Sequence, residues 1–289
     1  MINLSDTDLQ AKLQRLKDIL TDMGNAVIAY SGGVDSTFLL KVAHDVLGDN
    51  VIAVTARSST YPEREFNEAC ELVKQIGAKH VVIISEELEI EGFRSNPVNR
   101  CYYCKKELFN KIWDIANEHG INHVLDGSNV DDTDDFRPGM KAAHELGVES
   151  PLRESGMTKS DIRALSKAMG LPTWNKPSFA CLSSRFPYGQ PISEKKLSMV
   201  EQAEQFLLDK GFIQVRVRYH GDIARIEVAP EERHRFFDEH LMDEIAARFK
   251  QIGFAYTALD LAGYRTGSMN EVLKEEMPDE RTTTETTAQ

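Results

Sequence analysis

The sequence lacks a long hydrophobic run. No apolar stretch approaches the roughly 18 to 20 residues that are needed to cross a bilayer. The first twenty residues, MINLSDTDLQAKLQRLKDIL, are typical of a polar amphipathic helix and not of a signal peptide. These observations predict a cytoplasmic protein that has no membrane partner.

Positive charge is scarce as well. Lys and Arg number 34 and Asp and Glu number 46, which gives a formal net charge of −12. This negative net charge argues against general, stable binding to nucleic acid, although it is compatible with a local basic patch.

Cysteine is also rare, with four residues in a chain of 289. A disulfide scaffold needs more, and a reducing cytosol keeps such residues as thiols. Cys70 is expected in the core, because it shares a helix face with Phe66 and Val73. The positions of the other three, Cys101, Cys104 and Cys181, indicate that they belong to a functional site.

The length suggests two domains, on a prior of about 150 residues each. In the first part of the chain, short apolar runs alternate with helix-like segments, which predicts an α/β domain with a parallel sheet. The expected strands lie at 26–30, 51–56, 80–85 and 123–127, and the expected helices at 35–47, 62–76 and 100–118.

The pattern changes near Pro187, where a stretch rich in Pro, Ser and aromatic residues ends. A helix at 194–210, a hairpin at 214–228, a helix at 231–251 and a strand within 254–264 predict a smaller α+β domain. We therefore expect domains at 1–186 and 187–275. The polar residues 276–289 are expected to be a disordered tail.

The stretch AYSGGVDSTFLL, residues 29–40, places two glycines between an expected strand and an expected helix. Such a loop presents backbone N–H groups at the positive end of the helix dipole, which suits phosphate. It has neither the lysine of the Walker A motif nor the three glycines of the Rossmann fingerprint. SGGVDS instead resembles the PP-loop of the ATP pyrophosphatases, which split ATP into AMP and pyrophosphate. The alternative is an ordinary tight turn, with Asp35 or Ser36 capping the helix.

The PP-loop interpretation implies a fold, a ligand and its contacts. The fold is an adenine nucleotide alpha hydrolase-like parallel sheet, and the ligand is ATP with Mg²⁺. The N–H groups of residues 31–36 hold pyrophosphate, Gly32 and Gly33 allow close approach, and Asp35 helps to place Mg²⁺. The remaining expected contacts are the hydroxyls of Ser31 and Ser36, and Thr55 and Gly127 at the ends of neighbouring strands, where ordinary loop chemistry is the alternative.

Cys101 and Cys104 lie at the start of an expected helix, a position that lowers the pKa of a thiol and favours thiolate. Cys181 lies in the proline-flanked stretch SFACLSSRFPYG. Three thiols suit a zinc site, a redox dithiol or an iron–sulfur cluster with one iron that lacks a protein ligand. A reduced, idle pair is a further alternative, and spacing alone does not choose among them.

Five stretches together resemble the LarE-type sulfur transferases over nearly the entire chain: SGGVDS, DGSNVDDTDDFRPGMKAAHELGVESPL, NKPSFACLSSRFPYG, VRVRYHGDIARIEV and LDLAGYRTGSMN. LarE proteins adenylylate the two carboxylates of pyridinium-3,5-biscarboxylic acid mononucleotide and convert them to thiocarboxylates. The product is an intermediate of the nickel-pincer nucleotide of lactate racemase.

The resemblance leaves two sulfur sources open. In one type of the family a single cysteine, matching Cys181, gives up its own sulfur and becomes dehydroalanine. In the other, three cysteines hold a 4Fe–4S cluster, and Cys101, Cys104 and Cys181 match that pattern. Such a cluster carries an extra sulfide from a sulfide donor and permits repeated turnover. The family also implies a homo-oligomer.

A small-molecule substrate with several anionic groups suits arginine. We expect Ser184 and Arg185, next to Cys181, to act in catalysis. Glu204 and Asp222 are expected to bind metal or substrate, or simply to be solvated, and the acidic run DDTDD to be a charged loop. The other candidate arginines, for which a solvated basic face is the alternative, are Arg137, Arg216, Arg218 and Arg265.

Three rival functions stay open. A tRNA thiolase shares the PP-loop and often a three-cysteine cluster, but the charge of −12 weighs against it. An amide-forming PP-loop ligase needs no cysteine trio. A nucleotide-sensing or zinc-stabilised binding protein needs no catalysis.

Overall fold

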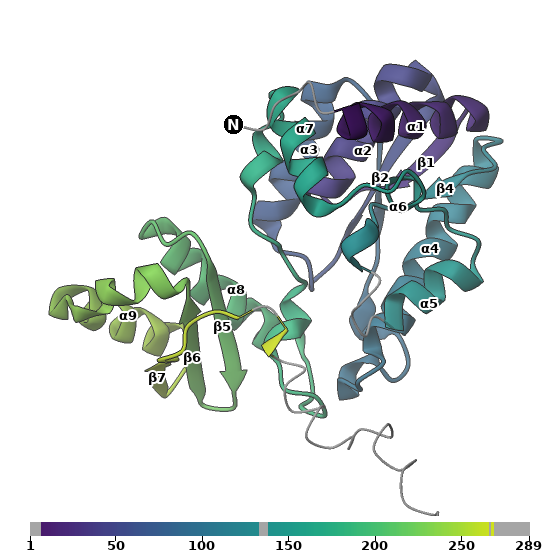
Figure 1. Ribbon diagram of the computed structural model, residues 1–289. Coiled ribbons are helices and arrows are strands. Elements are labelled where there is room, and N and C mark those ends of the chain that lie inside the picture. The colour runs from purple at the N-terminus through teal and green to yellow at the C-terminus, as the bar shows by residue number, and fades with distance from the viewer. Residues whose placement is uncertain (1–6, 133–137, 266, 269–289) are drawn as a thin grey trace, which may run out of the picture. The chain divides into compact units, whose positions relative to one another are not determined.

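The computed structural model describes residues 7–132, 138–265 and 267–268 (Figure 1). The chain forms two compact units. The N-terminal unit comprises the described residues up to Leu182 together with Tyr188–Leu197, and the C-terminal unit comprises Ser183–Pro187 and the described residues from Ser198 onward.

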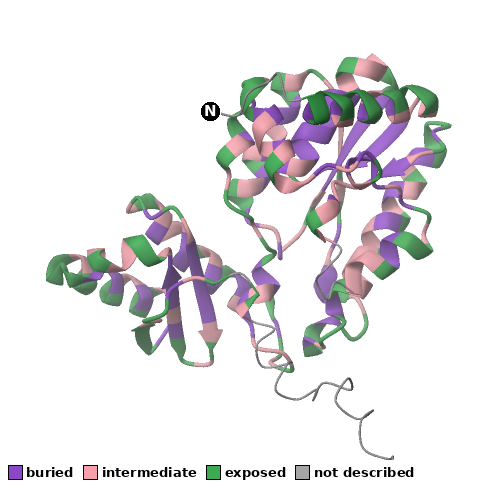
Figure 2. Cartoon of the chain, in the orientation of Figure 1, coloured by how far each residue is buried: buried purple, intermediate pink, exposed green. Residues whose placement is uncertain are grey.

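The N-terminal unit is built on a parallel sheet of four strands, which confirms the predicted α/β class. In spatial order the strands are β3 (Lys79–Ile84), β2 (Val51–Arg57), β1 (Ala26–Ala29) and β4 (Val124–Leu125). The central strands are buried, as Figure 2 shows in purple. Their nearly continuous apolar sequences are typical of strands that are covered on both faces.

Alternation along β1 directs its side chains into two cores. Ala26 and Ile28 pack in the core that contains Leu16, Leu20 and Phe38, whereas Val27 packs in the core with Phe109 and Ile112. The helices of this unit are α1 (Thr7–Met23), α2 (Val34–Leu47), α3 (Glu63–Ile76), α4 (Arg100–Glu118), α5 (Pro138–Glu145), α6 (Pro151–Glu154) and α7 (Lys159–Ala168).

The C-terminal unit contains a mixed sheet of three strands in the order β5–β6–β7. β5 (Val215–His220) and β6 (Ile223–Val228) form the predicted antiparallel hairpin, and β7 (Tyr256–Leu259) pairs with β6 in parallel. Alternate strand residues, among them Val217 and Ile226, pack in one apolar cluster with Phe249. The remaining helices are α8 (Glu194–Asp209), whose first turn belongs to the N-terminal unit, and α9 (Glu239–Ile252).

The single helix expected at 231–251 is wrong. Residues Pro230–Phe237 form 3-10 turns, and α9 begins only after Asp238. The Asp238 carboxylate accepts hydrogen bonds from the N–H groups of His240 and Leu241, so it caps a new helix. Among the described residues, no helix is both long enough and apolar enough to span a membrane.

Candidate active site

The glycine loop follows β1 and leads directly into α2. Gly32 has φ +62°, and a Cβ added there would lie 2.8 Å from the Cβ of Ala69 on α3. Both the left-handed backbone and the close packing therefore require glycine at this position. The hydroxyl of Tyr61 donates to the carbonyl of Ser31 at 2.8 Å and holds the other side of the loop.

The first turn of α2 has no side-chain cap. Gly33 is the N-cap residue and makes no side-chain hydrogen bond. The Ser36 hydroxyl lies 3.2 Å from that of Ser31 and accepts from the Ser31 N–H at 3.3 Å, so it bridges the loop and does not cap the helix. An uncapped N-terminus of this kind presents its N–H groups to an anion.

Asp35 lies on this first turn and is bound from two other segments. Its carboxylate forms an ion pair with Lys159, the first residue of α7, and accepts a hydrogen bond from the Asn129 side chain at 3.4 Å. Lys159 was not predicted from the sequence as a site residue. The motif T-x-x-D at Thr158–Asp161, which marks a helix start, is the only local signal for it.

Thr55 lies within β2 and Gly127 just after β4, and the two residues differ in setting. A Cβ on Gly127 would lie 3.0 Å from the Ser36 nitrogen, so glycine permits this contact with α2. Thr55 is 1% exposed, and its hydroxyl donates to the carbonyl of Tyr30 at 3.1 Å. In this structure Thr55 therefore secures the end of β1.

Lys176 supplies a second cation that sequence reasoning missed. Its ammonium lies 2.7 Å from a carboxylate oxygen of Glu65, 3.0 Å from one of Glu68 and 3.4 Å from the carbonyl of Gly32. It connects α3 to the glycine loop. The loop itself has no lysine, yet two lysines from distant parts of the chain reach it.

Cys101 and Cys104 lie on the first turns of α4, as expected, but the expected lowering of their pKa is wrong. Burial raises the pKa of the Cys104 thiol well above its usual range, and the Glu87 carboxylate and Cys181 add to this. Although Cys101 reaches the surface, the protein around it also raises its pKa, with a further contribution from Cys181. Desolvation is the largest cause of the raised pKa at both thiols.

The electrostatic coupling to Cys181 also shows that the three thiols lie near one another within the N-terminal unit. A trio of thiols is the donor set that a 4Fe–4S cluster takes when one iron has no protein ligand, so the residues fit that group by their chemistry. Among the described residues, however, no three His, Cys, Asp or Glu side chains are gathered closely enough to hold a metal ion.

The prediction that Cys70 lies in the core is wrong. Cys70 is half-buried, and Ala69 occupies the buried position of α3 beneath the glycine loop. All four cysteines, each in the described part of the chain, are thiols.

The C-terminal unit buries an ion pair. Both Nε and an Nη of Arg185 donate to the Glu204 carboxylate at 2.8 Å, and Glu204 also accepts from the Val217 N–H at 2.8 Å. The Arg185 side chain is 0% exposed and that of Glu204 7%. The solvated alternative for Glu204 is therefore wrong.

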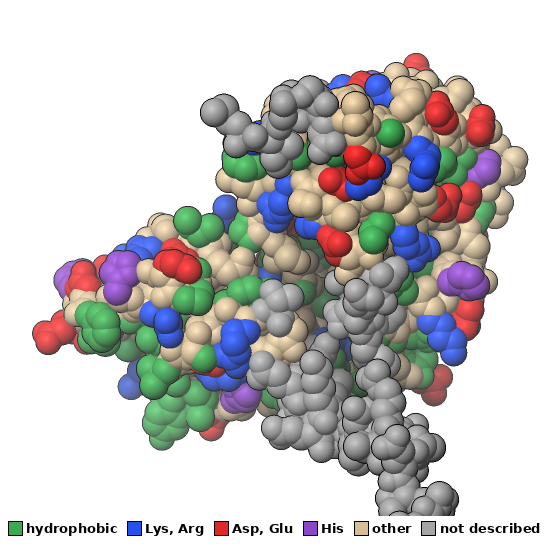
Figure 3. Space-filling model, in the orientation of Figure 1, with side chains coloured by type: hydrophobic (Ala, Val, Ile, Leu, Met, Phe, Trp, Pro, Cys, Tyr) green, Lys and Arg blue, Asp and Glu red, His purple; other side chains and the backbone are tan. Residues whose placement is uncertain are grey.

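Arg216 and Arg218 share one face of β5, as the period of two predicts, but both are buried. Arg218 pairs with Glu227 at 2.7 Å and donates to the Ser184 carbonyl at 2.8 Å. Burial, together with the charge of Arg185, lowers the pKa of Arg216 to about 10, so it stays protonated at neutral pH. The alternative of a solvated basic face is thus wrong for these two residues. On the surface drawn in Figure 3, basic and acidic side chains are interspersed.

The remaining predicted residues are less informative. Arg265 and Asp222 are exposed, and the Asp222 carbonyl accepts from the Ala255 N–H at 2.9 Å. Arg137 and part of the DDTDD run lie outside the described residues.

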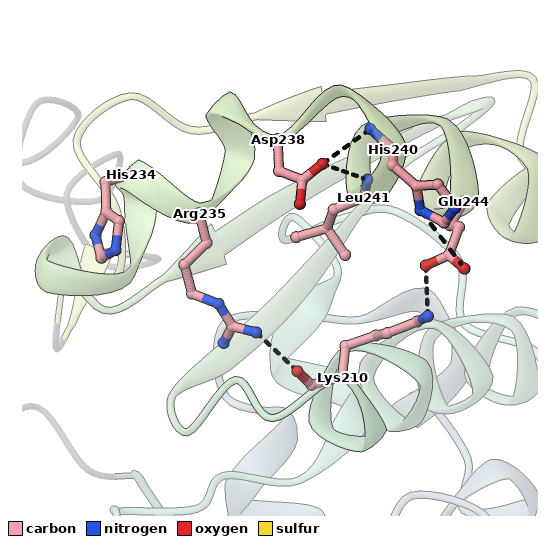
Figure 4. Close-up of a pocket in the computed structure, with 7 residues that line it drawn as sticks. All are labelled: Lys210, His234, Arg235, Asp238, His240, Leu241 and Glu244. Atoms are coloured by element: carbon pink, nitrogen blue, oxygen red, sulfur yellow. Dashed lines mark hydrogen bonds and ion pairs between the residues drawn. The ribbon is translucent and has the colours of Figure 1, made fainter.

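A pocket of about 440 Å³ lies elsewhere in the C-terminal unit (Figure 4). Its polar groups are engaged with one another: Lys210 pairs with Glu244, Arg235 donates to the Lys210 carbonyl at 2.7 Å, and Asp238 caps α9. It contains none of the predicted site residues.

Comparison with known proteins assigns the chain to a family. Residues 25–172 match the family model of the argininosuccinate synthase N-terminal HUP domain. Pyridinium-3,5-bisthiocarboxylic acid mononucleotide synthase of Lactiplantibacillus plantarum, the LarE protein, is 41% identical over 92% of this chain and 96% of its own length. The chain belongs to the LarE family. An uncharacterised protein of Synechocystis is 44% identical over 92% of this chain and 99% of its own length.

LarE membership confirms the resemblance seen in the sequence, and with it the class of PP-loop ATP-dependent sulfur transferase. A more distant match, argininosuccinate synthase of Methanocaldococcus jannaschii, is 30% identical over 51% of this chain. It covers about half of the chain, as expected when a nucleotide-binding domain is shared among enzymes of different function.

Proposed function

We propose that this protein adenylylates the carboxylates of pyridinium-3,5-biscarboxylic acid mononucleotide with ATP and converts them to thiocarboxylates. The observation that carries the proposal is the uncapped N-terminus of α2 behind a glycine loop, with Asp35 on its first turn. It occurs in a chain that is 41% identical to the Lactiplantibacillus plantarum synthase.

The adenylylation step uses groups of the N-terminal unit. The N–H groups of residues 31–36 hold the β- and γ-phosphates, and the hydroxyls of Ser31 and Ser36 border them. Asp35 orients Mg²⁺, which screens the phosphate charge. A substrate carboxylate oxygen then attacks the α-phosphorus of ATP and forms the acyl adenylate. The bond between the α-phosphorus and the oxygen that bridges the α- and β-phosphates breaks, and pyrophosphate leaves into the loop.

In the second step, sulfide displaces AMP from the acyl adenylate. We propose that Cys101, Cys104 and Cys181 hold a 4Fe–4S cluster, which when bound supplies an open iron that can carry the sulfide. The raised pKa values of Cys101 and Cys104 mean that both thiols must lose their protons when they bind metal. Sacrifice of the Cys181 sulfur is the alternative route.

The C-terminal unit supplies groups for an anionic substrate. Arg185, Arg216 and Arg218 bring three buried guanidinium groups to a region with two buried carboxylates, those of Glu204 and Glu227. The Nε of Arg218 has no hydrogen-bond partner among the described residues. A buried donor of this kind favours an incoming anion. Arg265 and Ser184 are proposed as further contacts.

We further propose that the protein works in the cytoplasm as a homo-oligomer and receives sulfide from a separate donor. A tRNA thiolase is the second candidate, favoured only by the thiol trio. A salt-sensitive gel shift with tRNA would support it.

The proposed reaction is tested with purified protein, Mg²⁺, ATP and the biscarboxylate substrate. AMP, pyrophosphate and a product heavier by the exchange of oxygen for sulfur are expected. Failure to form AMP would refute the function.

The sulfur source is tested on protein purified without oxygen. About four iron and four sulfide per chain, lost in single alanine variants at Cys101, Cys104 and Cys181, would support the cluster. A metal-free protein that loses the mass of one molecule of hydrogen sulfide at Cys181 after turnover, as conversion to dehydroalanine requires, would establish the sacrificial route. Zinc on the trio would make Cys101 and Cys104 structural.

A further inference from the structure

We propose that Lys159 exchanges partners when the nucleotide binds. In the nucleotide-free protein its ammonium neutralises Asp35, and in the complex Mg²⁺ takes Asp35 while Lys159 moves to the β- and γ-phosphates. Lys159 would thus provide the cation that the glycine loop lacks. The inference rests on the ATP site proposed above.

The position of Lys159 is fixed by its backbone. It is the first residue of α7, whose start is held by a capping box in which Thr158 and Asp161 exchange hydrogen bonds. Its own N–H donates to the Asp131 carboxylate at 2.7 Å. The base of the side chain is therefore anchored beside the loop, while its four-carbon stem stays free to rotate.

The pair with Asp35 is suited to exchange. The Lys159 side chain is 32% exposed and that of Asp35 22%, and ion pairs that solvent reaches in this way contribute little to stability. Mg²⁺ carries twice the charge of an ammonium group and prefers carboxylate and phosphate oxygens, so it displaces lysine from Asp35 when the phosphates arrive. The released ammonium then lies next to new negative charge.

Lys176 does not have this freedom. It is held by two carboxylates, those of Glu65 and Glu68, and its side chain is 15% exposed. It therefore keeps its place under the loop, and Lys159 is the lysine that can move.

The test compares Lys159→Met and Lys159→Arg with the matched control Lys12→Met. Lys12 forms an ion pair with Asp161, which is also on α7, and the two side chains are 22% and 20% exposed. The control thus removes a similar pair from the same helix, and because Asp161 also caps the start of α7, it tests whether a disturbed helix start alone weakens binding. Binding of magnesium pyrophosphate and of α,β-methylene-ATP is measured by calorimetry over a series of Mg²⁺ concentrations.

We expect Lys159→Met to weaken pyrophosphate binding about tenfold or more, since a charge-assisted contact is lost. The Mg²⁺ concentration that half-saturates binding of the ATP analogue should fall, because no ammonium competes for Asp35. Lys159→Arg should stay within about threefold of wild type, since it keeps the charge. Lys12→Met should change neither quantity.

Unchanged pyrophosphate affinity in Lys159→Met, or an equal loss in Lys12→Met, overturns the proposal. Weaker binding with an unchanged Mg²⁺ requirement also overturns the exchange. A wild-type protein that binds pyrophosphate but forms no AMP from the substrate refutes the proposed reaction, while the variants still decide the role of Lys159. A wild-type protein that binds neither ligand refutes both.

Discussion

The two units of this protein place their charged groups differently. In the N-terminal unit, Asp35 and Lys159 meet at a loop that solvent reaches, with side chains 22% and 32% exposed. In the C-terminal unit, Arg185 and Glu204 meet in the interior, with side chains 0% and 7% exposed. Charges of the first kind can change partners, whereas charges of the second kind are part of the fold. Removing one partner should therefore affect mainly function at the Asp35–Lys159 pair and mainly stability at the Arg185–Glu204 pair.

The largest effect is expected in the C-terminal unit. Glu204→Gln leaves the Arg185 guanidinium buried without its counter-charge, which should lower the free energy of unfolding by about 3–5 kcal/mol. Urea unfolding of the C-terminal unit measures this change in the free energy of unfolding. Asp209→Asn, at an exposed position of the same helix within the C-terminal unit, should cost less than about 0.5 kcal/mol. Equal costs would mean that the buried pair does not stabilise the unit.

In the N-terminal unit the corresponding change should spare the fold. Asp35→Asn removes the proposed Mg²⁺ contact and should lower the rate of AMP formation by roughly 10²-fold. The Tm should hardly change, because the lost ion pair is partly exposed. Asp45→Asn is the control on the same helix, where Asp45 pairs with Lys41 and is 45% exposed. A large drop in Tm for Asp35→Asn would break the distinction between the units.

Backbone packing under the loop should give an intermediate effect. Gly32→Ala forces alanine into the left-handed backbone conformation and brings its Cβ within 2.8 Å of the Cβ of Ala69. We therefore expect the free energy of unfolding to fall by about 2–3 kcal/mol. Gly24 has a similar φ of +70° but nothing within 4 Å of an added Cβ. Gly24→Ala should therefore cost about 1–2 kcal/mol, which is the conformational part alone. The difference between the two variants measures the packing.

The smallest effect is expected from pH. Burial lowers the pKa of His80 in the N-terminal unit and of His220 in the C-terminal unit, with help from nearby cations. Because the folded protein then binds fewer protons than the unfolded chain, stability is complete above about pH 6.5 and falls as the pH drops from there toward the folded pKa values.

Unfolding at pH 7.5 and 5.5 checks this dependence. His80→Gln and His220→Gln should each reduce it. A protein that becomes more stable at pH 5.5 through these histidines would contradict the prediction.

The sheet of the N-terminal unit and the glycine loop were predictable because their signals are local. Apolar strands that alternate with amphipathic segments imply parallel pairing, and SGGVDS lies directly between a strand and a helix. The contacts of Lys159 and Lys176 were not predictable, since they join residues that lie more than one hundred positions apart in the sequence.

Burial explains the other errors. A helix start lowers a thiol pKa only where its stabilisation of the thiolate exceeds the cost of desolvation, and at Cys104 burial raises the pKa. Glu204 lies on a helix that looks solvated in sequence, yet a buried arginine from another segment turns it into an interior residue. Both outcomes depend on tertiary packing, which periodicity does not encode.

The exposure of Cys101 and the half-buried setting of Cys104 have an evolutionary consequence. Neither thiol fills a cavity in the core, so exchanging either for another small residue disturbs little packing. A lineage can thus gain or lose this pair by two point substitutions while the glycine loop and the sheet stay intact. Under the cluster proposal, single-use and renewable sulfur donation would then differ by only these two residues.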